Sequence, residues 1–195
     1  MTLTTSAATD HLFSEAHTAY DFADTPLTDE HLQAIYETVK WAPTAMNSQP
    51  LRIAFARSAD AKLDLERYVG PGNVAKVRSA PVTAILAYDA DWHEHLPALM
   101  PFATDPHLAW QDPARREPMA KMNATLQAGY FILGVRAHGL AAGPMGGFDR
   151  EGVDRAFFPD GRWRSLLLVN IGHPGDEAFR PRMPRLSFDQ AAVLV

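Results

Sequence analysis

Apolar residues recur with helical spacing in two long segments of the chain. The first segment follows Thr28, a suitable N-cap, and must end near Ala42 because a proline comes next. Its apolar side chains fall at positions i, i+3, i+4 and i+7 and form one buried face: Leu32, Ile35, Tyr36 and Val39. The second segment, residues 119–138, is apolar on nearly all sides in its later turns. It predicts a central buried helix that ends at Gly139.

Three shorter runs have the composition of strands, at residues 51–57, 81–88 and 164–171. The middle run is apolar almost throughout, which is typical of a strand buried on both faces. Two further helices are predicted after capping residues: Ser58 to Gly70, and Asp149 to Phe157 or Phe158. This order of helices and strands predicts an α+β fold in three layers.

Residues 89–118 interrupt this pattern. The segment holds five prolines, two tryptophans and three of the eight histidines, and it has no clear periodicity. Long irregular connections are usually functional flaps or mobile inserts, so we expect a flap here. His93 and His95 also invite a metal-site interpretation, but no third ligand stands at a recognisable spacing, and we predict no metal site.

Length and charge restrict the class of protein. With 195 residues and no repeat or break in composition, we expect one domain over residues 11–195 and a poorly ordered tail over residues 1–10. The net charge of -5 gives no electrostatic reason to expect binding to nucleic acid or to an anionic membrane. The chain has no cysteine, no secretory signal and no apolar run that could span a membrane, and we expect a cytoplasmic protein.

One octet, residues 43–50, combines two prolines with several hydrogen-bonding side chains. It reads Pro-Thr-Ala-Met-Asn-Ser-Gln-Pro and lies between the first helix and the first strand. Two prolines stiffen it, and hydroxyl and amide side chains line it. Such a loop could bind a flat ligand with a polar edge, or it could be a well-capped surface turn.

The octet resembles the Pro-Ser-x-x-Asn-x-Gln-Pro signature of the nitroreductase family, the FMN-dependent NAD(P)H oxidoreductases. Three more segments match the family's motifs in order: residues 72–76 with 80–82, residues 139–149, and residues 180–184. Together they span about residues 16–188. Several segments look most like the branch that contains malonic semialdehyde reductases. The Gly-x-Gly-x-x-Gly and Gly-x-Ser-x-Gly motifs are absent, so neither a Rossmann site nor a hydrolase is indicated.

The resemblance implies a site for the FMN phosphate. Arg182 would contact the phosphate with help from Arg180, and Arg185 is a further candidate. Thr18 matches an N-terminal serine of the family, whereas two arginines expected near it are missing and only His17 remains. We therefore expect weaker FMN binding than in relatives.

The resemblance also implies contacts to the flavin ring. Lys76 would stabilise negative charge on the reduced ring, and Asn73 would hydrogen-bond the same edge. Asn47 would lie near the substrate, so Lys76 and Asn47 are the candidate catalytic residues, whereas Gln49 braces the loop. The remaining candidate cofactor contacts are Pro43, Thr44, Ala45, Asn123, Pro144, Met145, Gly146 and Gly147. Asn123 could instead be a satisfied buried amide.

By the same resemblance, the protein would be a homodimer with a mostly antiparallel sheet and two flavins at the subunit interface. NADH or NADPH would reduce FMN, and a second substrate would then be reduced in a ping-pong cycle. The branch suggests malonic semialdehyde, which would give 3-hydroxypropionate, with Arg52 or Arg115 as a cation for its carboxylate. A nitroaromatic or quinone substrate is the alternative, and a flavin-binding protein without turnover is the second alternative.

Overall fold

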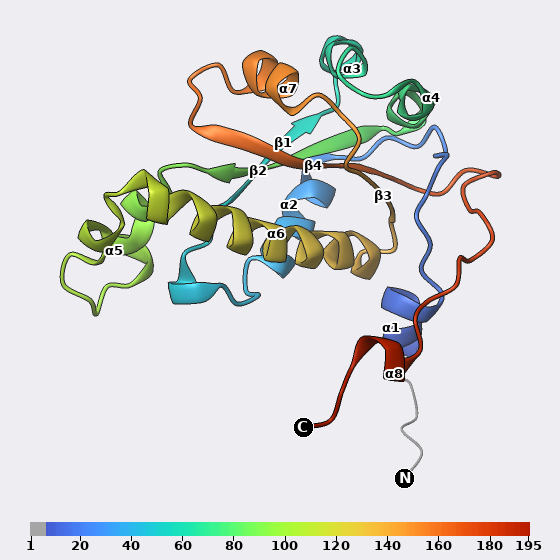
Figure 1. Cartoon of the computed structure of the whole chain (residues 1–195). Helices are drawn as coiled ribbons and strands as arrows, with labels where there is room; N and C mark the ends of the chain where they lie inside the picture. Colours follow the sequence, from blue (N-terminus) through green and yellow to red (C-terminus); the bar gives the residue numbers. More distant parts are fainter. Residues whose placement is uncertain (1–6) are drawn as a thin grey trace.

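The computed structural model describes residues 7–195 and places a four-stranded antiparallel sheet at its centre (Figure 1). The strands are β1 (Leu51–Ala56), β2 (Val82–Asp89), β3 (Ala141–Met145) and β4 (Trp163–Gly172), in the order β1-β2-β4-β3. All eight residues of β2 are buried, as its continuous apolar sequence predicts.

Helices cover both faces of the sheet (Figure 1). On one face lie α2 (Asp29–Val39) and α6 (Pro113–Ala137), and on the other lie α3 (Ala59–Glu66), α4 (Pro71–Ser79) and α7 (Arg150–Phe157). Alternate residues of β2 pack against the helices on opposite faces of the sheet. Leu86 packs in one buried cluster with Phe131 of α6, whereas Ile85 packs in the other with Leu65 of α3. The predicted α+β, three-layer fold is confirmed.

Short helical segments complete the chain. They are α1 (Ala7–Thr9), η1 (Asp10–Ser14), η2 (Ala45–Asn47), η3 (Trp92–His95), α5 (Leu96–Leu99), η4 (Pro106–Trp110) and α8 (Phe188–Ala191). Of the tail expected over residues 1–10, residues 1–6 lie outside the described part of the chain, and the rest belongs to α1 and the start of η1.

Two elements differ from the sequence prediction for local reasons. The Gly70-Pro71-Gly72 run was expected to end a helix only, but Pro71 also begins α4, because a first-turn proline needs no N–H and already has a helical φ. Strand β3 was not predicted, because Gly143 and Pro144 are poor strand residues. It lies at the edge of the sheet, where a missing N–H can be tolerated.

The insert after β2 is more ordered than its sequence indicates. It contains η3, α5 and η4, and α6 begins at Pro113 rather than at Met119, with Pro118 inside the helix. Trp92 and Leu96 are fully buried against Tyr88 and the first turns of α6. Opening of this insert as a flap stays a prediction. Within residues 7–195, no helix combines the length and the apolar character needed to cross a bilayer.

Candidate functional site

The N-terminal segment and the C-terminal tail lie together at one edge of the sheet. Ala19 N–H donates to the carbonyl of Ala142 on β3 at 3.0 Å, and Tyr20 N–H donates to the carbonyl of Ala178 at 2.8 Å. These bonds bring two segments from opposite ends of the chain to the same side of β3 (Figure 1).

A basic pocket of about 160 Å³ opens between these two segments. Its lining contains no carboxylate: Ala16, His17, Thr18, Tyr20, Arg136, Arg180, Pro181, Arg182, Met183 and Arg185. Arg182 Nη2 donates to the carbonyl of Ala16 at 3.1 Å, which ties the tail to the N-terminal segment. Among residues 7–195, none of the four arginines forms an ion pair with an acidic side chain. The pocket is therefore suited to an anion with several oxygen acceptors.

A second pocket of about 200 Å³ adjoins the first, because Thr18 and Tyr20 line both. It is completed by Ala19, Asn73, Lys76, Gly143, Pro144, Met145 and Gly146. Lys76 Nζ donates to Asn73 Oδ1 at 3.0 Å and lies 4.4 Å from the centroid of the Tyr20 ring. The three-residue spacing on α4 places both side chains on one helix face. The ammonium group of Lys76 is therefore held at the wall of the pocket.

Two glycines shape this pocket in different ways. A Cβ on Gly143 would lie 2.6 Å from the Ala19 carbonyl oxygen, so only glycine permits the close approach of the N-terminal segment to β3. A Cβ on Gly146 would meet nothing within 4 Å, so the backbone at this position borders open space. An extended molecule with a phosphate at one end and a flat, polar-edged ring at the other fits this pair of pockets.

The octet forms a strained loop at the other end of the molecule. Met46, Asn47 and Gln49 have φ angles of 57°, 49° and 41°, a left-handed conformation that residues other than glycine adopt at a cost. Asn47 Nδ2 donates to the carbonyl of Leu99 at 3.1 Å, and Gln49 Nε2 donates to Asn47 Oδ1 at 2.7 Å. Gln49 thus braces the loop in this structure, as the sequence interpretation expects.

Asn123 anchors this loop from α6. Its side chain is 1% exposed, its Oδ1 accepts from the backbone N–H of Ala45 at 2.8 Å, and its Nδ2 donates to the carbonyl of Met119 at 3.0 Å. Both polar atoms are therefore used within the protomer. In this structure Asn123 orients the octet, and its suggested contact with a flavin stays a prediction.

The octet does not line either of the two adjoining pockets. Asn123, at the octet, and Arg136, in the basic pocket, are thirteen residues apart on α6, which is about 20 Å along the helix. Figure 1 shows the segment after α2 near α5, far from α4 across the molecule. One protomer thus brings together His17, Thr18, Asn73, Lys76, residues 144–146 and the C-terminal arginines. Residues 43–47 and Asn123 line neither of these two pockets. Gly147 is adjacent, since its carbonyl accepts from Asn73 Nδ2 at 3.3 Å.

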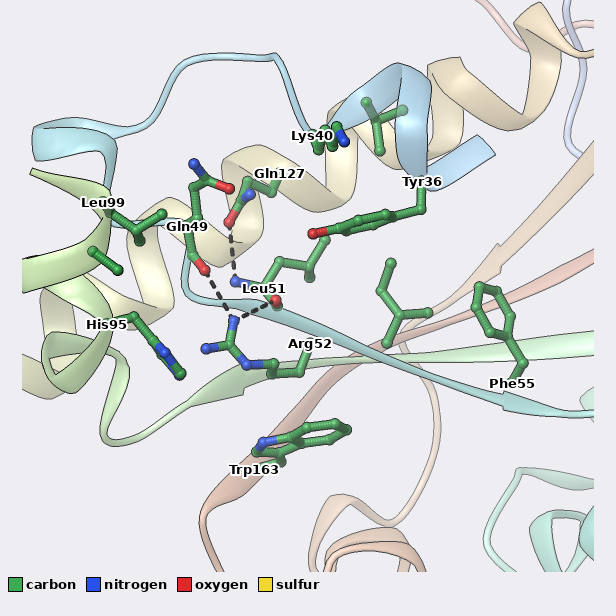
Figure 2. Close-up of a pocket in the computed structure, with 13 residues that line it drawn as sticks. Tyr36, Lys40, Gln49, Leu51, Arg52, Phe55, His95, Leu99, Gln127 and Trp163 are labelled. Atoms are coloured by element: carbon green, nitrogen blue, oxygen red, sulfur yellow. Dashed lines mark hydrogen bonds between the residues drawn. The ribbon is translucent and has the colours of Figure 1, made fainter. Parts of the chain in front are cut away.

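A larger cavity of about 530 Å³ lies along β1 (Figure 2). Its lining is mainly apolar: Tyr36, Val39, Lys40, Gln49, Leu51, Arg52, Ile53, Phe55, His95, Ala98, Leu99, Gln127 and Trp163. Figure 2 shows Arg52 donating to the backbone carbonyls of Gln49 and Leu51. Size alone would select this cavity, whereas the pocket that four arginines line lies at the other end of the molecule.

The two arginines suggested for a substrate carboxylate are not placed for that role in the protomer. Arg52 Nη2 forms an ion pair with Asp89 Oδ2 at 2.7 Å, and Arg115 is exposed with its guanidinium over the Trp110 ring. Burial disfavours ionisation of Asp89. Hydrogen bonds from Arg162 and the backbone of Asp91, with the charge of Arg52, outweigh burial and lower the pKa of that carboxyl.

The two histidines of the insert have separate surroundings. His93 is buried, and burial together with the charge of Arg116 lowers its pKa. His95 Nε2 lies 3.5 Å from Asp89 Oδ2. Within residues 7–195, no three metal-ligating side chains come together.

Among the lining residues that sequence reasoning did not name, two carry an aromatic ring or a charge, Tyr20 and Arg136. Tyr20 lies under both Lys76, at 4.4 Å, and Arg180, at 5.7 Å from the ring centroid. Arg136 lies in the last turn of α6 and lines the basic pocket. Its position two residues before the helix C-cap was a weak signal, since a basic residue there is common for reasons of the helix dipole alone.

The chain is similar to known proteins in sequence and in fold. Residues 14–173 match the model of the nitroreductase family. A protein of Streptomyces coelicolor with the provisional name NADH dehydrogenase/NAD(P)H nitroreductase is 50% identical over 181 residues, covering 92% of this chain and 90% of its own. A protein of the same provisional name from Rhodopseudomonas palustris is 48% identical and covers 93% of each chain. The solved structure of a nitroreductase-like protein from Exiguobacterium sibiricum in complex with FMN covers 100% of both chains at a TM-score of 0.85 and 19% identity.

Proposed function

The chain belongs to the nitroreductase family, and on that premise we propose that it is an FMN-dependent oxidoreductase that takes its electrons from NADH or NADPH. The observation that carries the proposal is the pair of adjoining pockets, one lined by arginines and one by Lys76. A phosphorylated flavin needs both an anion site and a polar contact beside its ring. The names of the relatives and the FMN in a structural neighbour support this choice of cofactor.

Each group of residues has a distinct role in this proposal. Arg180 and Arg182 bind the phosphate, with Thr18 and His17 beside them, and Arg185 extends the positive charge. The backbone of residues 144–146 would border the ring, since the open space at Gly146 leaves room for it.

FMN bound by these residues would supply the redox chemistry, as acceptor of a hydride from the nicotinamide and donor of electrons to the second substrate. Lys76 places a positive charge beside the polar edge of the ring and so raises its reduction potential. Asn73 holds the ammonium in position through its hydrogen bond. The protein thereby contributes position, charge and exclusion of water.

We also propose that the site is completed by a second copy of the chain. The octet, which the family resemblance assigns to the site, lies about 20 Å along α6 from the basic pocket of its own protomer and lines neither pocket. In a homodimer, residues 43–45 and Asn47 of one protomer could reach the pockets of the other. Four large apolar side chains on and near α2 and α6 are exposed and could form the interface: Tyr36, Trp41, Met122 and Leu126.

For the second substrate, a nitroaromatic or quinone acceptor has the stronger support, because the relatives carry the name nitroreductase. Reduction of malonic semialdehyde stays a hypothesis from the resemblance alone. Arg52 is engaged with Asp89 and Arg115 lies at the surface, so neither offers a free cation for the carboxylate within one protomer.

The test is spectroscopic and kinetic. Purified protein reconstituted with FMN should show flavin absorbance, and NADH or NADPH should bleach it without oxygen. Steady-state rates with a nitroaromatic, a quinone and malonic semialdehyde then rank the substrates, and light scattering gives the mass of the assembly. Flavin absorbance that neither nucleotide bleaches would contradict the enzyme proposal and favour a flavin-binding protein without turnover.

A further inference from the structure

Arg136 lines the basic pocket from α6, whereas the arginines that the sequence motif identifies come from the C-terminal tail. We propose that Arg136 is an additional anion-binding residue of this pocket and contacts the phosphate of the bound cofactor together with Arg182. The inference rests on the proposed function, because it names a residue of that same site. It would make the phosphate site of this chain depend on α6 as well as on the tail.

The hydrogen bonding of Arg136 is incomplete. Its Nη1 donates to the carbonyl of Leu12 at 3.0 Å, which fixes the guanidinium against η1. Its Nε is buried and has no partner among the described residues. Buried donors in native proteins nearly always find an acceptor, so the unpaired Nε shows that the described residues alone do not satisfy this guanidinium. The remaining donors of the planar guanidinium are also available for the forked contact that phosphate oxygens favour.

The charges around Arg136 support the same conclusion. Burial and, secondarily, the charge of Arg182 lower the pKa of Arg136. Two guanidinium groups close together repel each other, and no carboxylate lines the pocket to compensate them. A dianionic phosphate would supply the missing negative charge between them.

The helix dipole offers a simpler reason for a cation at this position. The C-terminal end of α6 favours a basic residue in its last turn, wherever that side chain points. The dipole does not explain why Arg136 is half-buried, why its Nε lacks a partner among the described residues, or why it lines the pocket that three other arginines line, as well as a neighbouring one beside Glu15. A role for the dipole alone also predicts no preference for a phosphorylated ligand.

The test compares FMN with riboflavin, which has the same ring and no phosphate. Apo-protein is titrated with each flavin while flavin fluorescence is followed, for wild type, Arg136→Met, Arg136→Lys and a control. Arg155→Met is the control, because Arg155 is 71% exposed on its side chain and its ion pair with Glu151 lies on another helix. Melting temperatures with and without inorganic phosphate provide a reading that needs no flavin.

Arg136→Met should weaken FMN binding by roughly 10- to 100-fold, the loss expected for one charge-assisted contact, and should leave riboflavin binding unchanged. Arg136→Lys keeps the charge without the fork and should fall between. Arg155→Met should bind both flavins as wild type does. Inorganic phosphate should raise the melting temperature of wild type more than that of Arg136→Met.

The outcomes separate this inference from the proposed function. If wild type prefers FMN over riboflavin and both Arg136 variants keep that preference, Arg136 does not bind the phosphate and only this inference fails. Equal losses for FMN and riboflavin would assign Arg136 a structural role and overturn it too. If wild type binds neither flavin, the proposed function fails and this inference fails with it.

Discussion

Replacement of Asn123 by leucine tests whether α6 holds the octet in its strained conformation. The change keeps the size of the side chain and removes the acceptor of the Ala45 N–H, whose bond to Asn123 Oδ1 is 2.8 Å long. Because the asparagine is 1% exposed, water cannot easily replace it. The loop then has to keep three non-glycine residues at positive φ without this anchor.

The expected magnitude follows from this one lost partner. The bond is only partly buried and Ala45 itself is exposed, so its loss costs about 1 kcal/mol. For a chain of this size each kcal/mol lowers the melting temperature by about 2–4 °C. Each left-handed residue of the loop stores a further cost of order 1–3 kcal/mol, which favours relaxation to another conformation once the anchor is gone. We therefore expect Asn123→Leu to melt several degrees lower and to lose at least about tenfold in turnover at saturating FMN.

Thr125→Ala provides the matched control on the same helix. Its hydroxyl donates to the carbonyl of Lys121 at 2.7 Å on an exposed face, so its loss should change the stability by less than about 0.5 kcal/mol. Differential scanning fluorimetry and nitroaromatic turnover measure the two effects. The reasoning is refuted if Asn123→Leu has the same melting temperature as Thr125→Ala and reduces the nitroaromatic at the wild-type rate.

Three further predictions concern other parts of the structure. The pKa of His93 is lowered from 6.5, first by burial and then by Arg116, so the folded protein takes up the proton at a lower pH than the unfolded chain. Stability is then full above pH 6.5 and decreases as the pH falls towards the folded pKa; thermal melts across this range should show the slope, and His93→Phe should flatten it. Lys76→Met should lower the flavin reduction potential by roughly 30 mV or more in a redox titration, about 1.4 kcal/mol for two electrons, and an unchanged potential would show that the ammonium is not beside the ring. Lys62→Met should reduce the free energy of unfolding by about 1 kcal/mol, because Lys62 Nζ donates to the carbonyl of Ala80 at 2.6 Å at the end of α4; a chemical-denaturation curve that matches wild type would contradict this.

Elements with a consistent local signal could be predicted from the sequence. The apolar run of β2 reflects burial on both of its faces. The i, i+3, i+4, i+7 pattern predicts helix α2, but only Leu32 and Ile35 of its four positions are buried, and Tyr36 is 47% exposed. The start of α4 and strand β3 could not be predicted in this way. Their proline and glycine residues are acceptable only at a helix N-terminus and at a sheet edge, and the sequence does not state in advance where these lie.

The residues of the candidate site also fall into those that the sequence could predict and those that it could not. Lys76, Asn73 and Pro144 line one pocket. They could be named from the sequence because each family motif is a continuous segment. Arg136 and Tyr20 belong to the same pockets through contacts between distant segments. A helix with a strongly apolar sequence gives no sign that its last turn faces the two chain ends, so this part of the site became visible only in the folded chain.

Helix α6 joins the two halves of the proposed site within one protomer. One part of it orients the octet through Asn123 and receives the N–H of Leu51 on Gln127, and its last turn carries Arg136. If each site takes its octet from one protomer and its cations from the other, every site depends on the α6 helices of both copies. Cofactor binding would then stabilise the dimer, and association would in turn raise cofactor affinity, because a ligand that contacts both copies binds the assembly more tightly than either part.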